Sequence, residues 1–372
     1  MHSKVKSVIV AALAALGSAF AVAPGHASTV IVVHPGQSIQ AAVDAASPGD
    51  TVSVLAGTYH ESVTISKNDI TLTGAGSGPT GTVLLPPTTF PDNFCATVPP
   101  DGAAPSQGGG VCVFGDFDPT TGVISSRVTG DRVTNMRISG FPGDDIGVFG
   151  ADSLRVDHVA MTDGGVYGLA LVASTRTLID DNTVSDVVAN SGAAMYVAFL
   201  PNSDSAISNN TMDTTSLGLF VQDAADLAIT YNTITNSCDG VLVLDDNHPD
   251  DGQAGPFGDI AIAGNTLSAN NEVCPGNRRQ PNIQGTGIAM VGTTNTAVTG
   301  NTVTGNTGAD LLSGGIVLQS AVQFGGLDEG NVAITGNTVT GNGPDDLSWD
   351  GNGTGVTMSA NTCGTSSPAG MC

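Results

Sequence analysis

The sequence is poor in positive charge, in glutamate and in aromatic side chains. Its 372 residues carry 10 Lys and Arg against 34 Asp and Glu, a net charge of −24, and only three of the acids are Glu. A phosphate backbone needs a basic surface, so nucleic acid is nearly excluded as a partner and an anionic membrane is disfavoured. The scarcity of Glu and Lys beside 50 Gly argues against a helical protein and favours many short strands. Because 40% of the residues are apolar, we expect a packed core rather than disorder.

The N-terminus has the pattern of a secretory signal. Lys4 and Lys6 precede an apolar run over 8–22, and Gly25-His26-Ala27 offers small residues at a cleavage position. We therefore expect a signal peptide over 1–27, a secreted, extracellular protein, and one mature domain over 28–372. The alternative is a retained anchor helix, but the apolar run is short for a membrane span of about 20 residues.

Six cysteines in an exported chain predict disulfides. Their order along the chain suggests three local pairs, although six cysteines allow many other pairings: Cys95 with Cys112, Cys238 with Cys274, and Cys363 with Cys372. No CxxC motif or histidine cluster indicates zinc.

One short motif recurs along most of the chain. It consists of an apolar residue, two variable residues, Asn-Thr and another apolar residue, and its asparagines are Asn182, Asn210, Asn232, Asn265, Asn301, Asn337 and Asn361. A second recurring strand lies between the copies and opens on a small residue, as in 168–171 and 240–243. A period in the low twenties, built from short alternating strands without helical periodicity, predicts a solenoid of β-coils. Stacking would align the asparagines in a buried ladder.

The N-terminal region resembles a known family. Val33-His-Pro-Gly-Gln-Ser-Ile-Gln-Ala-Ala-Val43, followed by Pro48-Gly-Asp-Thr-Val52, Gly57-Thr-Tyr59 and Glu61, is similar to the opening of right-handed parallel β-helix proteins of the pectate-lyase-like superfamily. Similar openings occur in pectin methylesterases and in β-helix proteins that help to mature nitrous oxide reductase. The resemblance implies an all-β, right-handed parallel β-helix of about eleven coils, capped by a short helix over about 39–46. It is specific for fold and weak for activity.

The known catalytic signatures of β-helix carbohydrate enzymes are not found as complete sets. The polygalacturonase motifs, the pectate lyase Arg-x-Pro-x-x-Arg pattern and the alginate epimerase Asp-Pro-His-Glu motif are missing. No family catalytic residue is therefore carried over to this chain, and whether it is an enzyme stays open.

Insertions between the repeats indicate where a functional site could lie. Surplus residues are expected near 86–118, 245–258, 270–284 and 320–330, and the middle two leave opposite edges of the same sheet. They would form the walls of a groove, since loops on a rigid scaffold are where function concentrates. Phe149, Tyr196 and Phe220 share one predicted register on the floor, with Asp223 close by, so Tyr196, Phe220 and Asp223 are candidate substrate-binding residues.

The first wall carries Asp245-Asp246-Asn-His248-Pro-Asp250-Asp251. Its carboxylates suit calcium bound by Asp245, Asp246, Asp250 and Asp251, or catalysis by Asp245, Asp246 and His248. The alternative is a solvated acidic loop.

The second wall carries Arg278 and Arg279, whose guanidinium groups suit a sugar carboxylate. The alternative is charge balance with the acidic loop. Outside the groove, His158 follows Asp157 and is either a base held by that carboxylate or a turn residue.

Three functions compete. The first is a lyase or hydrolase acting on an acidic extracellular polysaccharide, which we expect to work as a monomer with calcium as the one candidate cofactor. The second is a non-catalytic carbohydrate- or protein-binding β-helix protein. The third is a metal-handling accessory protein, which lacks the Cys, Met and His cluster that delivery of a soft metal favours. A polysaccharide-directed role is preferred.

Overall fold

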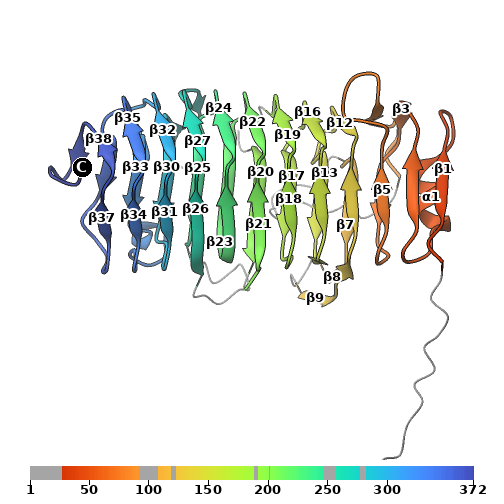
Figure 1. The fold of residues 1–372 in the computed structure, drawn as a ribbon, viewed down its shortest axis with the longest axis horizontal. Coiled ribbons are helices and arrows are strands. Elements are labelled where there is room, and N and C mark those ends of the chain that lie inside the picture. Colours follow the sequence, from red (N-terminus) through yellow and green to blue (C-terminus); the bar gives the residue numbers. More distant parts are fainter. Residues whose placement is uncertain are drawn as a thin grey trace, which may run out of the picture.

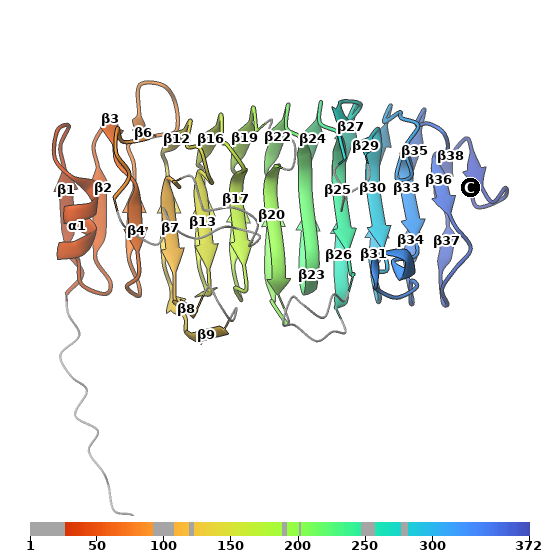
Figure 2. The same cartoon turned by 180° about the vertical axis from the view of Figure 1, so that it is seen from behind.

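The computed structural model describes residues 27–91, 108–118, 123–187, 192–200, 202–246, 257–276 and 282–372. Within these ranges the chain winds into a rod of stacked coils, in which strands of successive coils pair in parallel (Figures 1 and 2). Each regular coil contributes one strand to each of three sheets, here called sheets A, B and C in the order in which the chain visits them. The predicted parallel β-helix is confirmed.

The three sheets run the length of the rod. Sheet A contains β1 (Val30–Val33), β2 (Thr51–Val54), β5 (Thr71–Thr73), β11 (Arg132–Thr134), β15 (Arg155–Asp157), β18 (Leu178–Asp180), β21 (Ser205–Ser208), the second half of β23 (Leu217–Thr230), β26 (Gly258–Ala263), β31 (Ala297–Thr299), β34 (Ala333–Thr335) and β37 (Thr357–Ser359). Sheet B contains β3 (Gly57–His60), β6 (Thr82–Leu85), β12 (Arg137–Ser139), β16 (Ala160–Thr162), β19 (Thr183–Ser185), β22 (Thr211–Asp213), β24 (Thr233–Thr235), β27 (Thr266–Ser268), β32 (Thr302–Thr304), β35 (Thr338–Thr340) and β38 (Thr362–Cys363). Sheet C contains β4 (Val63–Ile65), β7 (Val111–Phe114), β13 (Ile146–Phe149), β17 (Tyr167–Val172), β20 (Ala193–Leu200), the first half of β23, β25 (Asp239–Leu244), β30 (Thr286–Val291), β33 (Gly314–Gln319), β36 (Leu347–Trp349) and β39 (Ser366–Ser367).

Three small two-stranded sheets lie at the corners between the main sheets. These are the antiparallel β8 (Asp116–Asp118) with β9 (Val123–Ser126), the parallel β10 (Val128–Thr129) with β14 (Ala151–Asp152), and the antiparallel β28 (Val273–Cys274) with β29 (Ile283–Gln284). In the described residues, sheet B has 11 strands, which matches the predicted number of coils.

The core is the interior of the coils. Alternate residues of each strand face inward, because side chains of a β-strand point to opposite sides in turn. In sheet A the inward column is apolar and has no exposed surface at Val156, Ile179, Ile207, Ile229, Ile262, Val298 and Ile334. Stacked branched side chains therefore fill the rod along its whole length.

A ladder of buried asparagines runs along the corner between sheets A and B, as predicted. Asn265 is typical: its Oδ1 accepts from the backbone N and the Nδ2 of Asn232 at 2.8 and 3.0 Å. Its own Nδ2 donates to the carbonyl of Ile229 at 2.9 Å and to Oδ1 of Asn301 at 3.0 Å. The residue before each ladder asparagine is in the left-handed region, with φ between 54° and 68°; these residues are Asp181, Asn209, Tyr231, Gly264, Gly300, Gly336 and Ala360. The corner is thus one tight turn repeated in each of the seven coils that carry a ladder asparagine.

A second ladder, which the sequence analysis missed, lies where the chain leaves sheet B. Asn270, Asn306 and Asn342 each follow a first-ladder asparagine by five residues. Nδ2 of Asn270 donates to Oδ1 of Asn306 at 3.1 Å, and Nδ2 of Asn306 donates to Oδ1 of Asn342 at 3.0 Å. The ladder ends at Asp346, whose Oδ1 accepts from Asn342. The fixed offset of five residues was the signal in the sequence.

The N-terminal end of the rod is covered by helix α1 (Ile39–Ala45), close to the predicted 39–46. Ser38 caps the helix by accepting from the backbone N of Ala41, and Ile39 and Val43 are buried beneath it. At the C-terminal end of the helix, Nζ of Lys67 donates to the carbonyls of Val43 and Ala46 at 3.2 and 3.0 Å. This end of the apolar interior is therefore shielded from water.

The excursions from the rod leave both edges of sheet C. The chain between β25 and β26 leaves one edge, and the β28–β29 hairpin leaves the other. A third excursion, between β33 and β34, contains the 3-10 turn η2 (Val322–Phe324). Of the predicted insertions, residues 92–107, 247–256 and 277–281 lie outside the described residues.

Two of the three predicted disulfides are present. Cys238 is bonded to Cys274 and Cys363 to Cys372, with Cα–Cα distances of 5.8 and 5.3 Å. Cys112 is also disulfide-bonded, but its predicted partner Cys95 lies outside the described residues. The first of these bonds ties the start of β25 to the base of the β28–β29 hairpin.

We predict that Asn265→Ala lowers the free energy of unfolding by about 3 kcal/mol, because buried hydrogen-bonding groups on both neighbouring coils lose their partner. Urea unfolding followed by circular dichroism measures the loss. Asn361→Ala is the control, because this last ladder residue is only half-buried and water can replace it. Equal losses in the two variants would contradict a role for the buried ladder in stability.

Replacing Cys238 and Cys274 together by Ser should lower stability by about 3–4 kcal/mol, since the bond closes a sequence separation of 36 residues. Thermal unfolding without reductant tests this against the wild type. Peptide mapping that links Cys238 to any cysteine other than Cys274 would overturn the assignment.

Candidate functional site

The candidate site is the outer face of sheet C between the two excursions. Outward-facing side chains on this face form a second apolar cluster, separate from the interior of the coils; it includes Phe149, Tyr167, Ala170, Tyr196, Leu217, Leu242, Ala289, Val291 and Val317. Seven apolar or aromatic side chains pack against its margin while keeping partial exposure, among them Phe220 and Leu244. The rod thus has an apolar face on the side where its chain excursions lie.

An aromatic column crosses this face. The rings of Tyr167 and Tyr196 are stacked with centroids 4.8 Å apart, and Phe220 lies 5.4 Å from Tyr196. The Tyr196 hydroxyl donates to Oε1 of Gln222 at 3.0 Å. Tyr196 has only 2% of its surface exposed, whereas Phe220 is half-buried. Of the predicted floor rings, Phe220 is therefore the one with open surface.

The predicted shared register of Phe149 was wrong. Tyr196 and Phe220 do pair directly, but Gly147 pairs with Ala170, so Phe149 is level with Val172. The prediction placed Gly147 level with Gly168. In the structure Gly147 pairs with Ala170, because β17 begins at Tyr167, two residues before the partner of the first residue of β13. Phe149 nevertheless faces outward, since a shift of two residues keeps a side chain on the same face.

The other predicted site residues are only partly described. Asp223 is buried, with 1% exposure and a φ of 48°, where β23 passes from sheet C into sheet A. Asp245 and Asp246 follow β25 directly, and the backbone N of Asp245 donates to the carbonyl of Val291 at 2.9 Å. The rest of the two walls, His248, Asp250, Asp251, Arg278 and Arg279, lies outside the described residues.

No group of three or more His, Cys, Asp or Glu side chains within the described ranges is arranged to hold a metal ion. The predicted calcium set is represented there by Asp245 and Asp246 alone, so calcium binding stays a prediction.

Buried carboxylates flank the face, and the sequence analysis did not identify them. Asp239, at the start of β25, has no exposed surface, and its Oδ1 accepts from the backbone N of Gly218 at 2.9 Å. Burial raises the pKa of Asp239 to about 7, against the opposing effect of the Gly218 hydrogen bond. Glu329, at the base of the excursion between β33 and β34, has 1% exposure, and burial, together with Asp350 and Asp328, raises its pKa to about 7.

A third buried carboxylate lies at the other end of the face. Burial raises the pKa of Asp145 well above its ordinary value, and the nearby carboxylates of Asp144 and Asp163 raise it further. The sequence gives no signal that these aspartates are buried, because the chain is rich in Asp throughout.

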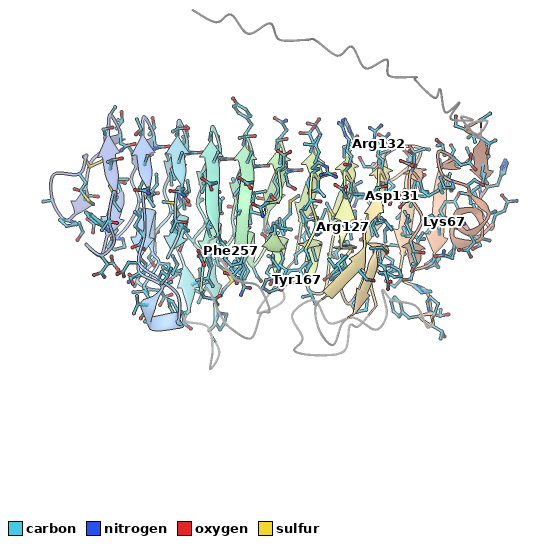
Figure 3. All side chains as sticks on the ribbon, turned by 90° about the horizontal axis from the view of Figure 1, so that it is seen from below. Lys67, Arg127, Asp131, Arg132, Tyr167 and Phe257 are labelled. Carbon is cyan, nitrogen blue, oxygen red and sulfur yellow. A yellow bond between two sulfur atoms is a disulfide. The ribbon has the colours of Figure 1, made fainter. Side chains whose placement is uncertain are left out.

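A different cluster surrounds Asp157 on sheet A. Burial tends to raise the pKa of this carboxylate, but hydrogen bonds from Arg132, His158 and Thr134 hold it below its usual range. Nδ1 of His158 lies 2.8 Å from Oδ2 of Asp157, and His158 has a φ of 57°. His158 is therefore both a turn residue and a partner of this carboxylate. The cluster is far from the outer face of sheet C, as the labels of Arg132 and Tyr167 show (Figure 3).

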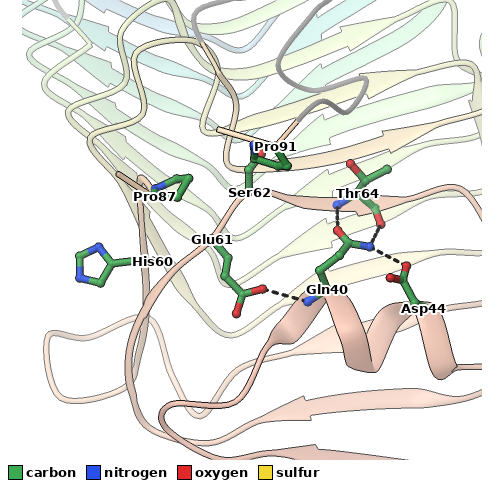
Figure 4. A pocket seen from close by; sticks show the side chains of 8 residues that line it. All are labelled: Gln40, Asp44, His60, Glu61, Ser62, Thr64, Pro87 and Pro91. Carbon is green, nitrogen blue, oxygen red and sulfur yellow. Dashed lines mark hydrogen bonds between the residues drawn. The ribbon is translucent and has the colours of Figure 1, made fainter. Parts of the chain in front are cut away.

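A cavity of about 460 Å³ opens beside the N-terminal cap, lined by Gln40, Asp44, His60, Glu61, Ser62, Thr64, Pro87 and Pro91 (Figure 4). Its polar groups serve the fold. Glu61 accepts from the backbone N of Ile39 and Gln40, and Gln40 exchanges two hydrogen bonds with the backbone of Thr64. These bonds join α1 to β4.

We predict that the buried carboxylates make the protein more stable in mild acid than at neutral pH. Asp239 keeps its proton up to about pH 7 in the folded chain but ionises near 3.8 when unfolded, so the folded state binds more protons between these values. Stability should therefore fall as the pH rises from about 4 to 7. Asp239→Asn should remove part of this fall, measured by urea unfolding across that range.

The control for this prediction is Asp226→Asn, which changes an exposed carboxylate of β23. It should leave the pH dependence as in the wild type. A pH profile that is the same in the wild type and in Asp239→Asn would show that Asp239 does not titrate in this range.

Comparison with known proteins supports the fold. The family described as the right handed beta helix region matches residues 118–266. No curated protein matches the sequence. None of the helices in the described part of the chain is long and apolar enough to cross a membrane.

Solved structures share the architecture at low sequence identity. A tailspike protein of E. coli bacteriophage HK620, solved with a pentasaccharide, has a TM-score of 0.59 and 14% identity over 87% of this chain and 57% of its own. The periplasmic alginate epimerase AlgG has a TM-score of 0.53 and 13% identity over 90% and 72% of the two chains. An alginate lyase from Paenibacillus sp. str. FPU-7 has a TM-score of 0.51 and 13% identity over 90% and 99%. The coil geometry and these structures show the fold of a parallel β-helix, and the match to the right handed beta helix region covers residues 118–266 of it.

Proposed function

We propose that this protein acts on or binds a polysaccharide outside the cytoplasm, with the glycan lying along the outer face of sheet C. The observation that carries the proposal is the aromatic column on that face, which lies between excursions on both edges and leaves Phe220 partly open. Flat rings can stack on the apolar faces of sugars. The structural neighbours named above include an alginate epimerase, an alginate lyase and a tailspike solved with a pentasaccharide, which supports a glycan as the ligand.

A location outside the cytoplasm is supported by the disulfides, since such bonds persist mainly in oxidising compartments. The signal peptide predicted over 1–27 would provide the export. Both features agree with the periplasmic setting of one structural neighbour.

Two functions fit this proposal, an enzyme that cleaves the glycan and a protein that only binds it. A lyase or hydrolase on an acidic glycan would use Asp245, Asp246 and His248, with Arg278 and Arg279 holding the sugar carboxylates. The alternative is a non-catalytic binding protein. Tyr196 and Asp223 are too deeply buried to touch a glycan without rearrangement, so Phe220 provides the stacking contact in either case.

We expect Phe220→Ala to weaken glycan binding about tenfold, which corresponds to about 1.4 kcal/mol. Affinity for a panel of acidic and neutral oligosaccharides, measured by calorimetry, tests this, and assays for reducing ends and unsaturated products on the same panel separate an enzyme from a binding protein. Tyr231→Ala is the matched control, because this aromatic residue is 67% exposed at the corner between sheets A and B. A wild-type protein that binds no member of the panel would refute the proposal.

The double variant Arg278→Ala/Arg279→Ala separates the two kinds of glycan. It should weaken an acidic oligosaccharide and leave a neutral one unchanged, because only the acidic sugar offers a carboxylate for a guanidinium group. Equal losses for both sugars would contradict a role for these arginines in carboxylate recognition.

A further inference from the structure

The outer face of sheet B carries a lattice of threonines that the proposed function does not use. Seven neighbouring strands of sheet B each present a threonine at the same register. The strands are β19, β22, β24, β27, β32, β35 and β38, and the threonines are Thr183, Thr211, Thr233, Thr266, Thr302, Thr338 and Thr362. Two residues further along each strand, a second column contains Ser185, Asp213, Thr235, Ser268, Thr304 and Thr340. These two columns are here called the hydroxyl lattice.

The first column of the lattice is open to solvent, and the second column is half-buried. In the first column every threonine except the half-buried Thr233 is exposed. From β19 to β35 of sheet B the inward neighbours are fully buried, as at Val184, Leu267 and Val303, so the alternation of the strand fixes which side chains face out. The strands of sheet B lie side by side along the upper rim of the rod (Figure 1).

The spacing of the lattice is regular in both directions. Parallel strands place successive rows about 4.8 Å apart, and the two columns lie about 6.6 Å apart along the strand. Both ladders of asparagines border this sheet, and such side-chain ladders keep many-stranded sheets flat. Threonine is stiff at χ1, so its hydroxyl and methyl groups repeat in place from row to row.

The register survives large changes in coil length. Successive ladder asparagines, each directly before a lattice threonine, are 28, 22, 33, 36, 36 and 24 residues apart. From β18 onward the described passage from sheet A to sheet B stays short, and the coils differ in length in the connections on either side of sheet C. The face therefore stays continuous while the opposite side of the rod varies.

The lattice is also nearly free of charge. Its 13 positions contain one charged residue, Asp213, in a chain with 34 acids. Oγ1 of Thr235 donates to this carboxylate at 2.6 Å, so it is tied into the lattice. A neutral, rigid face with hydroxyls at fixed intervals suits a partner that is itself a periodic array of hydrogen-bonding groups without net charge.

We propose that the hydroxyl lattice binds ice. Water molecules held by evenly spaced hydroxyls on a flat face take up fixed positions, and the two repeats of this lattice are comparable with the oxygen repeats on faces of hexagonal ice. The methyl groups between the hydroxyls leave those waters few other partners. The face would join a growing ice surface through many weak contacts, which act together because the strands are rigidly stacked.

Thermal hysteresis and the shape of ice crystals, measured on the purified full chain, test the proposal. The wild type should lower the freezing point below the melting point and facet the crystals. Thr266→Lys, at the centre of the lattice, should remove most of this activity because a long charged side chain holds the ice surface away. Ala261→Lys is the matched control, since it places the same side chain on sheet A of the same coil at an exposed position.

Partition of the protein into a slowly growing ice hemisphere gives a second measurement that does not depend on any variant. A wild type that stays in the liquid and shows no hysteresis overturns the proposal, as do equal losses in the two lysine variants. Loss of binding to microcrystalline cellulose in Thr266→Lys, without any effect on ice, would assign the face to a neutral crystalline polysaccharide instead. Circular dichroism of both variants confirms that the fold is retained.

Discussion

The stacking of one tight corner on the next determines the rest of this structure. At the junction of sheets A and B, each coil from Asn182 onward places an asparagine at the corner, and its amide joins the backbone of the coil before to the amide of the coil after. The polar side chain would be costly in an apolar core if any of its groups were left unpaired. Because the next coil satisfies it, the same groups fix the register of neighbouring coils. Flat sheets, continuous apolar columns and aligned outer faces all follow from that register.

The fold could be predicted because its signals are local and repeated. Each signal lies within a few consecutive residues. These signals are the Asn-Thr motif, the small residue that opens the strands of sheet C and the capping sequence before Glu61, and the first two can be recognised because they recur. Counting residues between repeats also predicts which edge of a sheet the surplus chain leaves. The pairing of Cys238 with Cys274 was predicted from the order of the cysteines along the chain.

The candidate site was harder to predict because burial depends on what covers a residue. Tyr196 faces outward, as its register requires, yet it is buried in a second apolar cluster outside the coils. Asp145, Asp239 and Glu329 look like ordinary acids in a sequence with 31 Asp, and only their three-dimensional setting raises their pKa values. The misplaced register of Phe149 has a similar origin, because the length of β17 could not be read from its opening glycine.

The two asparagine ladders do not extend equally along the rod. The first is continuous from Asn182 to Asn361, the second from Asn270 to Asn342, and the coils before Asn182 rely on large apolar side chains such as Met136, Ile138 and Phe141. Resistance to unravelling should thus be graded along the axis. Under an applied tension, or in the first moments of chain collapse, the C-terminal half would behave as a single cooperative block, whereas the N-terminal coils would depend on the clamp of α1 to hold their end closed. The two ends of the rod should therefore differ in their resistance to mechanical unfolding, although the coils look alike along its length.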